Sequence, residues 1–290
     1  MAVKTILVPM QTEGAATDAL EPAIVLAEKL NAHVVAQHIR QRPTLAAPSG
    51  YEPLAVAYIR ENSDEFVKEQ NRHSEALKAE FLAACNEHSV RVILPEEHAE
   101  NKAASASWRD EEGNLPYDFA LSARVADLTV LQGSGKDASL AETGLAEELL
   151  FQSARPVMII PNEGMRRFPE TIVVGWDGGL EAARAINAAL PILQQARKVI
   201  VLTVDKSRLA APDAESAAAF LRMHDVNATF DQVSRVKEKA ENVFYEAARD
   251  RDADLLVLGA YSHNRWRETI LGGFTRHMLR HADIPVLLAH

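Results

Sequence analysis

Apolar and polar residues alternate along this chain in two repeating periods, one typical of buried strands and one typical of amphipathic helices. Short apolar runs bounded by turn residues predict parallel strands, and the first of them lie at positions 5–10, 33–39, 90–94, 127–131 and 156–160. Apolar residues three and four apart predict helices between them, one after Thr17 and others at 60–87, 117–125 and 142–151. Strand followed by helix throughout is typical of a parallel sheet with helices on both faces.

Two stretches interrupt this pattern. Residues 41–53 (QRPTLAAPSGYEP) contain proline and glycine and predict a loop. Residues 98–118 are polar and irregular, and we interpret them as an insertion whose large apolar group is Trp108. A large apolar side chain in a polar loop usually becomes buried. Trp108 would therefore pack over a cleft, over a partner surface or on its own half.

The strand and helix pattern then begins again, because the chain contains an internal repeat. The run TIVVGWDGG (171–179) aligns without gaps with TILVPMQTE (5–13), at an offset of 166 residues. ADLLVL (253–258) matches ADLTVL (126–131) at an offset of 127, and IPVLLA (284–289) matches RPVMII (155–160). Two homologous halves explain these matches far better than chance does.

The second half has the same elements in shorter form. Its predicted strands lie at 199–204, 227–233, 254–258 and 284–288, and its predicted helices at 180–194, 213–224, 237–250 and 268–281. Pro191 would kink or end the first of these helices. The sequence thus predicts an α/β protein with two tandem, doubly wound, parallel-sheet domains of Rossmann-like type. We expect domains at 1–162 and 170–290, joined by the Pro- and Gly-bounded linker 161–169.

Composition narrows the functional classes. The net charge is −10 and the estimated pI is 5.5, which argues against a general binder of nucleic acid or of membrane surfaces. No apolar run approaches the ~18 residues of a membrane span, and the start of the chain lacks the pattern of a signal peptide. Cys85 is the single cysteine, so no intrachain disulfide can form and we expect a buried structural thiol. We therefore expect a cytoplasmic protein.

One stretch combines features of an anion site. The predicted strand at 254–258 is followed by Gly259, a polar loop, two more glycines and a helix. Glycines let the backbone approach a ligand closely, and a helix start offers unpaired amides. Arg265, Arg267 and Arg276 add positive charge. An ordinary loop with a solvated basic patch explains the same residues, since exposed ion pairs contribute only ~0–1 kcal/mol each.

The two repeats resemble the universal stress protein family over nearly the whole chain, and the ending DLLVLGAYSHNRWRETILGGFTRHMLRHADIPVLL is the most specific part. Nucleotide-binding members share the loop G-x2-G-x9-G-(S/T), which holds ATP phosphates, and an Asp after the first strand, which contacts the nucleoside. The resemblance places the second half's counterparts of these positions at Asp177, Gly259, Ser262, Gly272 and Gly273, with Thr275 two residues further on.

This loop departs from the family pattern at two positions. Ser262 stands where the second glycine is expected, which restricts positive φ there, and Gly273 replaces the hydroxyl residue. Arg265, Arg267, Arg276 and the Thr275 hydroxyl would bind phosphate oxygens in place of the missing groups. His263 is the titratable group of the loop near neutral pH. It would act in phosphoryl chemistry or, more simply, make a local hydrogen bond.

The first half has lost more of the pattern. At the aligned positions it carries Gln11, Gln132, Gly135, Thr143 and Ala146 in place of Asp177, Gly259, Ser262, Gly272 and Thr275. We therefore expect that the first half does not bind ATP in the family manner. Its expected role is to complete the fold and to pair with the second half through the closing strands.

Other motifs carry less weight. GSGK (133–136) lacks the first glycine and the final Ser or Thr of a phosphate-binding P-loop. His277 and His281 share a helix face but have no evident third ligand. Glu96, Glu97 and His98 would ligate a cation or serve as acid and base, and a solvated loop explains them as well. Trp176 would be a packing residue or a platform for stacking on a base.

We therefore expect a stress-related sensor whose second half binds ATP, with Mg²⁺ accompanying it, or a related small phosphate-bearing anion. The alternative is a protein-interaction module in which the glycine loop is a relic. Weak nucleotide hydrolysis comes third, because no catalytic constellation is visible and the chain is not expected to be an efficient enzyme. The expected partners are the small ligand, the other half in a pseudo-dimer and a second copy in a homodimer, without nucleic acid or membrane.

Overall fold

The computed structural model describes most of the chain: residues 2–11, 15–41, 53–94, 103–133, 140–161, 164–205, 213–235, 237–260, 278 and 283–290. The N-terminal half consists of β1 (Thr5–Pro9), α1 (Ala15–Leu30), β2 (His33–Gln41), α2 (Pro53–Glu87), β3 (Arg91–Val92), β4 (Ser105–Gly113), α3 (Tyr117–Ala123), β5 (Leu128–Gln132), α4 (Leu140–Gln152) and β6 (Val157–Ile160).

The C-terminal half repeats the order of strands and helices. It consists of β7 (Thr171–Gly175), α5 (Leu180–Leu193), β8 (Lys198–Val204), α6 (Ala214–Met223), β9 (Ala228–Val233), α7 (Ala240–Arg249), β10 (Leu255–Gly259) and β11 (Val286–Ala289). The helix predicted at 268–281 falls outside the described residues, apart from Met278, which is helical. Pro191 lies in the last turn of α5, two residues before its end, so the helix ends there.

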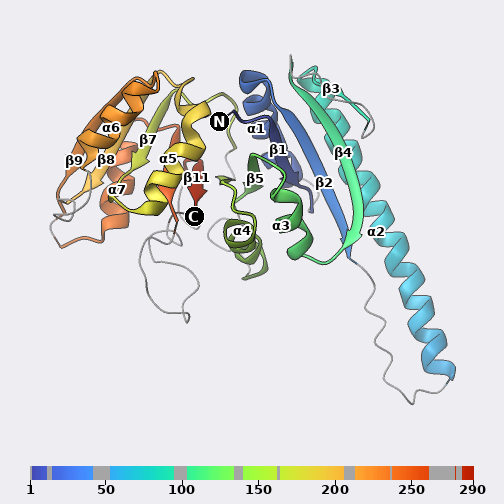
Figure 1. Cartoon of the computed structure of the whole chain (residues 1–290). Helices are drawn as coiled ribbons and strands as arrows, with labels where there is room; N and C mark the ends of the chain where they lie inside the picture. The colour runs from blue at the N-terminus through green and yellow to red at the C-terminus, as the bar shows by residue number, and fades with distance from the viewer. Residues whose placement is uncertain are drawn as a thin grey trace.

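All these strands form one continuous sheet, in the order β3-β4-β2-β1-β5-β6-β11-β10-β7-β8-β9 (Figure 1). Each half contributes parallel strands, and the halves join where β6 pairs antiparallel with β11 through Met158 and Leu287. Outward from this pair, the strands β5, β1, β2 and β4 of one half correspond to β10, β7, β8 and β9 of the other, and β3 is added at the edge beyond β4. The expected doubly wound fold and the pairing of the halves by their closing strands are confirmed, within one shared sheet rather than two separate ones. The domain limits 1–162 and 170–290 stay a prediction.

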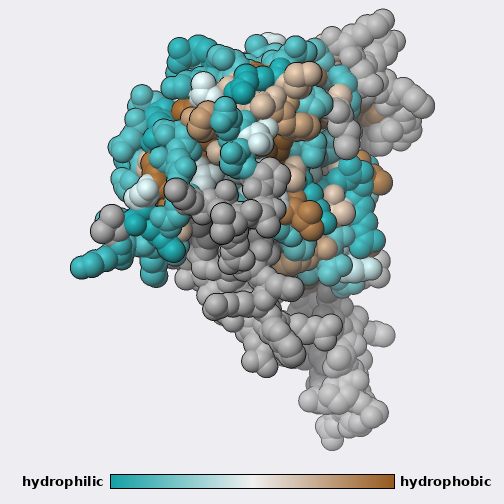
Figure 2. Space-filling model, turned by 60° about the vertical axis from the view of Figure 1, so that its left-hand side comes forward, coloured by the Kyte–Doolittle hydropathy of each residue, from teal (hydrophilic) through white to brown (hydrophobic). Residues whose placement is uncertain are grey.

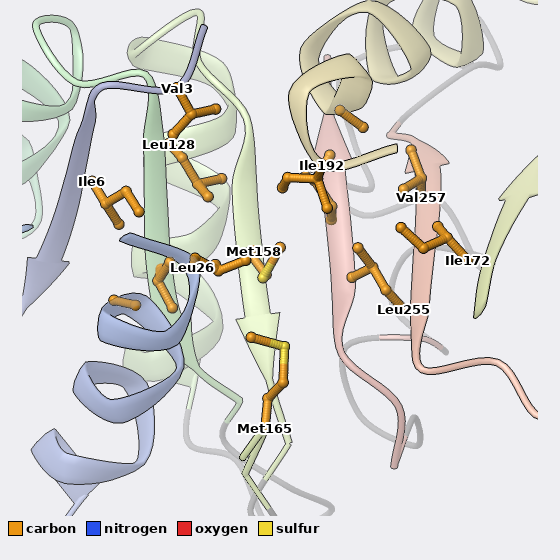
Figure 3. Packing of buried hydrophobic residues seen from close by; sticks show 14 of the residues in the cluster. Val3, Ile6, Leu26, Leu128, Met158, Met165, Ile172, Ile192, Leu255 and Val257 are labelled. Carbon is orange, nitrogen blue, oxygen red and sulfur yellow. The ribbon is translucent and has the colours of Figure 1, made fainter. Parts of the chain in front are cut away.

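Helices cover both faces of the sheet, and two buried clusters fill the space beneath them. One cluster joins α1, α2, α5 and α6 to the sheet and continues across both halves. Figure 3 shows Leu26, Met158 and Met165 on one side of it and Ile192 and Leu255 on the other. The second cluster joins α3, α4 and α7 to the opposite face. Strand residues alternate between the clusters because successive side chains of a strand point to opposite faces.

The repeat seen in the sequence is exact in the positions of two pairs of strands. The bounds of β7 and β1 differ by 166 residues, and those of β10 and β5 differ by 127. A carboxylate also recurs: Asp127 Oδ2 accepts hydrogen bonds from the main-chain N–H groups of Lys4 and Thr5. Asp254 Oδ2 does the same for the two main-chain N–H groups that precede and begin β7. The two halves therefore share details of construction as well as order.

The prediction of an irregular insertion at 98–118 is wrong for residues 105–113. These residues form β4, which pairs with β2 along its whole length. The strand escaped recognition because its second part is polar and exposed, and β3 covers β4 only at Ser105 and Ala106. No other described strand pairs with the rest of β4 on this side, and its charged side chains disfavour pairing with another chain. The strand predicted at 90–94 shrinks to Arg91–Val92.

Three further expectations concern burial. Trp108 packs on its own half, with its ring 5.8 Å from that of Phe81 on α2. Trp176 is buried in the core. Cys85 is buried as expected, and burial raises the pKa of its thiol to about 11.

The surface is mainly hydrophilic where the C-terminal half comes forward, and apolar residues form small groups on it (Figure 2). Exposed apolar side chains of this half include Phe220, Met223 and Phe230. Among the described helices, none is long and apolar enough to cross a membrane.

Candidate functional site

The predicted site begins where β7 ends, in the turn that leads into α5. The Oδ1 atom of Asp177 accepts a hydrogen bond of 2.8 Å from the main-chain N–H of Gly179, two residues on. Gly178 has φ +77°, a conformation that favours glycine. Gly179 then caps α5 without help from a side chain. The short turn leaves Asp177 exposed at the carboxyl end of the strand.

Gly259 ends the neighbouring strand β10, so it lies at the same edge as Asp177. The two strands pair in register, with Val257 opposite Val174. The first turn of α5 sits directly on Gly259: a Cβ atom there would lie 2.4 Å from the main-chain nitrogen of Ala182. Contacts under 3.0 Å essentially never occur for a real Cβ. Only glycine therefore lets the start of α5 approach the end of β10 this closely.

The structure thus brings together two of the predicted site residues, Asp177 and Gly259. The other eight lie outside the described residues: Ser262, His263, Arg265, Arg267, Gly272, Gly273, Thr275 and Arg276. The chain enters this segment from Ala260, whose main-chain N–H donates to the carbonyl of Ala289. The segment therefore starts from the edge where Asp177 and Gly259 lie.

The described part of this edge carries carboxylates. Asp177 is exposed, and Glu181 in the first turn of α5 lies 3.8 Å from Arg184, one turn along the helix. Further along the edge, Arg235 contacts Asp205 both through its main-chain N–H and through an ion pair of 2.6 Å.

Comparison with known proteins identifies this half of the chain. Residues 169–290 match the model of the universal stress protein family. The C-terminal half of the chain is therefore similar to that family. No curated protein matches the chain by sequence.

Two solved structures have the same fold over almost the whole length. A universal stress protein from Archaeoglobus fulgidus DSM 4304 is 13% identical with a TM-score of 0.64, covering 99% of this chain and 96% of that one. A putative universal stress protein from Pseudomonas aeruginosa UCBPP-PA14 is 17% identical with a TM-score of 0.53, covering 99% and 93%. The N-terminal half, which lies outside the matched residues, therefore shares the fold of a two-half universal stress protein.

The corresponding edge of the N-terminal half is built differently. Gln11 stands in the place of Asp177, and its main-chain carbonyl accepts a hydrogen bond of 2.8 Å from Nε2 of His73 on α2. Gln132 stands in the place of Gly259 and donates to Oδ2 of Asp18 on α1. At the second of these positions, the N-terminal half thus carries a side chain where the C-terminal half has only the backbone of Gly259. This supports the expectation that the first half does not bind ATP in the family manner.

A second contrast between the halves lies on the second strand of each. In the C-terminal half, the Thr203 hydroxyl donates to the carbonyl of Trp176. In the N-terminal half, the equivalent bond of 2.8 Å runs from Nδ1 of His38 to the carbonyl of Met10. Sequence reasoning missed His38 and His73. The signal available was a histidine at an inward position of the apolar run HVVAQHI.

The remaining motifs noted in the sequence give no further site. Glu96, Glu97, His98, His277, His281 and residues 134–136 of the GSGK run lie outside the described residues. Within the described ranges, no group of three or more metal-binding side chains occurs.

Proposed function

We propose that the universal stress protein domain at 169–290 binds ATP, or a related small phosphate-bearing anion, at the carboxyl ends of β7 and β10, as a cytoplasmic sensor. The observation that carries this proposal is the juxtaposition of Asp177 and Gly259 on paired strands, beside the first turn of α5. Ligands of doubly wound sheets bind at this edge. The family resemblance gives the same two positions to the nucleoside contact and to the phosphate loop.

The charges indicate how a nucleotide would lie. A phosphate would be repelled by the carboxylates of Asp177 and Glu181, whereas a ribose hydroxyl is a good donor to a carboxylate. The nucleoside therefore belongs at Asp177. The phosphates belong at the loop that follows Ala260, where Arg265, Arg267 and Arg276 supply charge and Gly272 and Gly273 supply backbone amides.

Mg²⁺ would enter with the phosphates. This ion keeps several waters and binds substrate phosphates together with one or two carboxylates. Glu181, in the first turn of α5, lies directly beside Gly259, where the phosphate loop begins, so the residues present fit such a role. The ion would neutralise phosphate charge beside the acidic rim.

A second candidate function is a protein-interaction module with a relic loop, and one observation favours it. Gly259 is required by the packing of α5 on β10. This requirement would preserve the glycine even if no ligand bound. Binding must therefore be tested at residues whose role in packing is small.

Asp177 is suited to that test because it is exposed, and asparagine keeps the side-chain oxygen that Gly179 uses. ATP binding to the purified chain would be measured by calorimetry for the wild type, for Asp177→Asn and for Arg265→Ala with Arg267→Ala. Gln11→Ala, at the equivalent place in the other half, is the matched control. Small molecules released by denaturing the wild type would be identified by mass spectrometry.

We expect a nucleotide in the released material, binding that weakens about tenfold or more in both C-terminal variants, which is ~1.4 kcal/mol, and no change in Gln11→Ala. Absence of binding at millimolar ATP, together with no released nucleotide, would favour the interaction module. Loss of binding in Gln11→Ala alone would mean that the site lies in the N-terminal half and would contradict the proposal.

A further inference from the structure

The long helix α2 is attached to the sheet by two different surfaces. Its C-terminal part is buried through apolar residues, Leu77, Phe81, Ala84 and Cys85. Its preceding part makes polar contacts instead, and residues 65–69 on the N-terminal side of these contacts are all exposed. In Figure 1, α2 runs behind β4 and continues beyond the end of the sheet. Among the residues whose side chains the structure describes, the polar contacts are therefore the attachment nearest to the N-terminal end of the helix.

We call this attachment the polar latch. Two contacts join it to the open end of the sheet: Nη1 of Arg40 donates to Asn71 at 3.0 Å, and the Ser74 hydroxyl donates to Asp110 at 2.8 Å. Asp110 also pairs with Arg40 at 3.0 Å. His73 completes the latch by donating to the carbonyl of Gln11. Through this last bond, the latch contacts Gln11, which corresponds to Asp177 in the second half, so this step of the inference rests on the proposed function of that edge.

His38 lies beneath the latch and is 1% exposed. Its ring is edge-on to that of His73, with centroids 5.5 Å apart, and stacks with Trp108 at 6.4 Å. Because Nδ1 faces the carbonyl of Met10, which only accepts, Nδ1 must carry the proton of the neutral ring. The Nε2 atom is buried and has no hydrogen-bond partner among the described residues. A second proton would therefore arrive at Nε2 without an acceptor.

We propose that the polar latch is released by acid, so that protonation of the His38 and His73 pair frees α2 up to Ser74 and uncovers the carboxyl edge of the first half. Protonation would place two imidazolium rings beside the guanidinium of Arg40, whose carboxylate neighbours include Asp110 and Glu112. Like charges close together in a buried site repel strongly. Leu77 and Phe81 remain anchored, so the helix pivots on its apolar part rather than detaching.

Electrostatics around His38 supports the direction of the effect. Burial lowers the pKa of His38 below 6.5, against smaller opposite effects of the Met10 carbonyl and Asp110, while His73 and Arg40 lower it further. A lowered pKa means that the open state binds the proton more tightly than the latched state. The latch is therefore fully favoured above pH 6.5 and loses stability as the pH falls from there toward the lowered pKa.

His33, on the same strand, provides a natural contrast. It is also largely buried, but Nδ1 and Nε2 each lie 2.9 Å from a serine hydroxyl, Ser105 and Ser107. A hydroxyl can rotate to accept a proton from either nitrogen. Burial and the charge of Arg109 lower the pKa of His33 as well, but its charged ring would keep an acceptor at each nitrogen, whereas the charged ring of His38 would lack one at Nε2 among the described residues.

The test is amide hydrogen exchange of the full chain at pH 7.5 and 5.5, corrected for the intrinsic pH dependence of exchange. The quantity compared is the protection factor of α2 around residues 71–76 divided by the protection factor of α5. For the wild type we expect this protection ratio to fall about tenfold on acidification. This is the factor expected when one imidazole of ordinary pKa binds a proton in the open state and not in the latched state. The variant His38→Asn keeps a donor for the Met10 carbonyl but does not titrate. Combined with His73→Gln, it is expected to show no pH dependence of the ratio, and His33→Gln is expected to behave as the wild type.

The same fall in the double variant, or an equal fall of protection in α5 and α2, would overturn the proposal. So would a constant ratio in the wild type. If the double variant fails to fold, His38→Thr replaces it, because Thr203 makes the equivalent bond in the other half of this chain. Retention of the acid response in His38→Thr would overturn the proposal equally.

Discussion

At the scale of the residue, Gly259 shows that one position can serve two purposes. The resemblance to the universal stress proteins assigns it to a phosphate loop, and the structure gives it a packing role in which a Cβ would lie 2.4 Å from the Ala182 nitrogen. A sequence pattern cannot separate these two reasons. Asp177, in contrast, is exposed and makes only the short turn to Gly179 within its own segment. The presence of a carboxylate at position 177 is therefore more informative about a ligand than the glycine at position 259.

The packing role predicts that Gly259→Ala destabilises the chain whether or not a ligand is present. Displacing the first turn of α5 is an overpacking defect, expected to cost about 1–3 kcal/mol in the free energy of unfolding. Urea denaturation without ligand measures this cost.

Gly144→Ala is the matched control. Gly144 lies inside α4, and a Cβ there meets nothing within 4 Å. Alanine is the better helix former, so a gain of about 0.5–1 kcal/mol is expected. Equal stability of Gly259→Ala and the wild type would contradict the close approach of α5.

At the scale of the element, the strands and helices of the C-terminal half were predictable and the edge of the N-terminal half was not. The apolar run of β7 and the spacing in α5 place these elements within a residue or two. The polar strand β4 carries exposed charges because most of it is an edge, and edge strands lack the apolar alternation on which prediction depends. The latch was hidden for a related reason. His38 and His73 are 35 residues apart in sequence, and only the packing of α2 on β2 brings them together.

The equivalence of elements in the two halves makes a quantitative prediction. Asp127 and Asp254 each accept two main-chain N–H groups at the start of β1 or β7. Asp127→Ala and Asp254→Ala are therefore expected to destabilise the chain by similar amounts, about 1.5–3 kcal/mol each, as for hydrogen bonds to a charged group. Urea denaturation would measure both variants.

Asparagine at either position keeps one acceptor oxygen, so its cost should be smaller. A large cost at one position with none at the other would mean that the halves, despite equal geometry, no longer depend on the same contact.

At the scale of the whole molecule, the antiparallel pairing of β6 with β11 joins the two halves into one continuous sheet. Both strands are buried along their length, and the cluster on the α1 side continues across them. A half without its neighbour would expose an apolar edge strand, which readily pairs with another chain.

This arrangement predicts the behaviour of the C-terminal half expressed alone. A chain of residues 164–290 is expected to form a dimer in which β11 pairs with β11 of a second copy, because an antiparallel pair of identical strands satisfies two-fold symmetry. Sedimentation equilibrium would report twice the mass of the fragment. A monodisperse monomer would show that the exposed strand is tolerated and that β6 contributes little.

One pair of contacts distinguishes the sister halves. Arg40 on β2 faces Asp110 on β4, whereas at the matching place Asp205 after β8 faces Arg235 after β9. The partner residues lie at different register positions, because Asp110 matches Gln232 and not Arg235, but the charges of the two bridges are reversed. If a folding chain matched β2 with β9, or β8 with β4, two cations or two anions would meet. In a protein with two similar halves, a strand of one half can pair with the wrong strand of the other half during folding. The reversed charges disfavour such mispairing, because Arg40 on β2 and Asp205 after β8 carry opposite charges at the matched position.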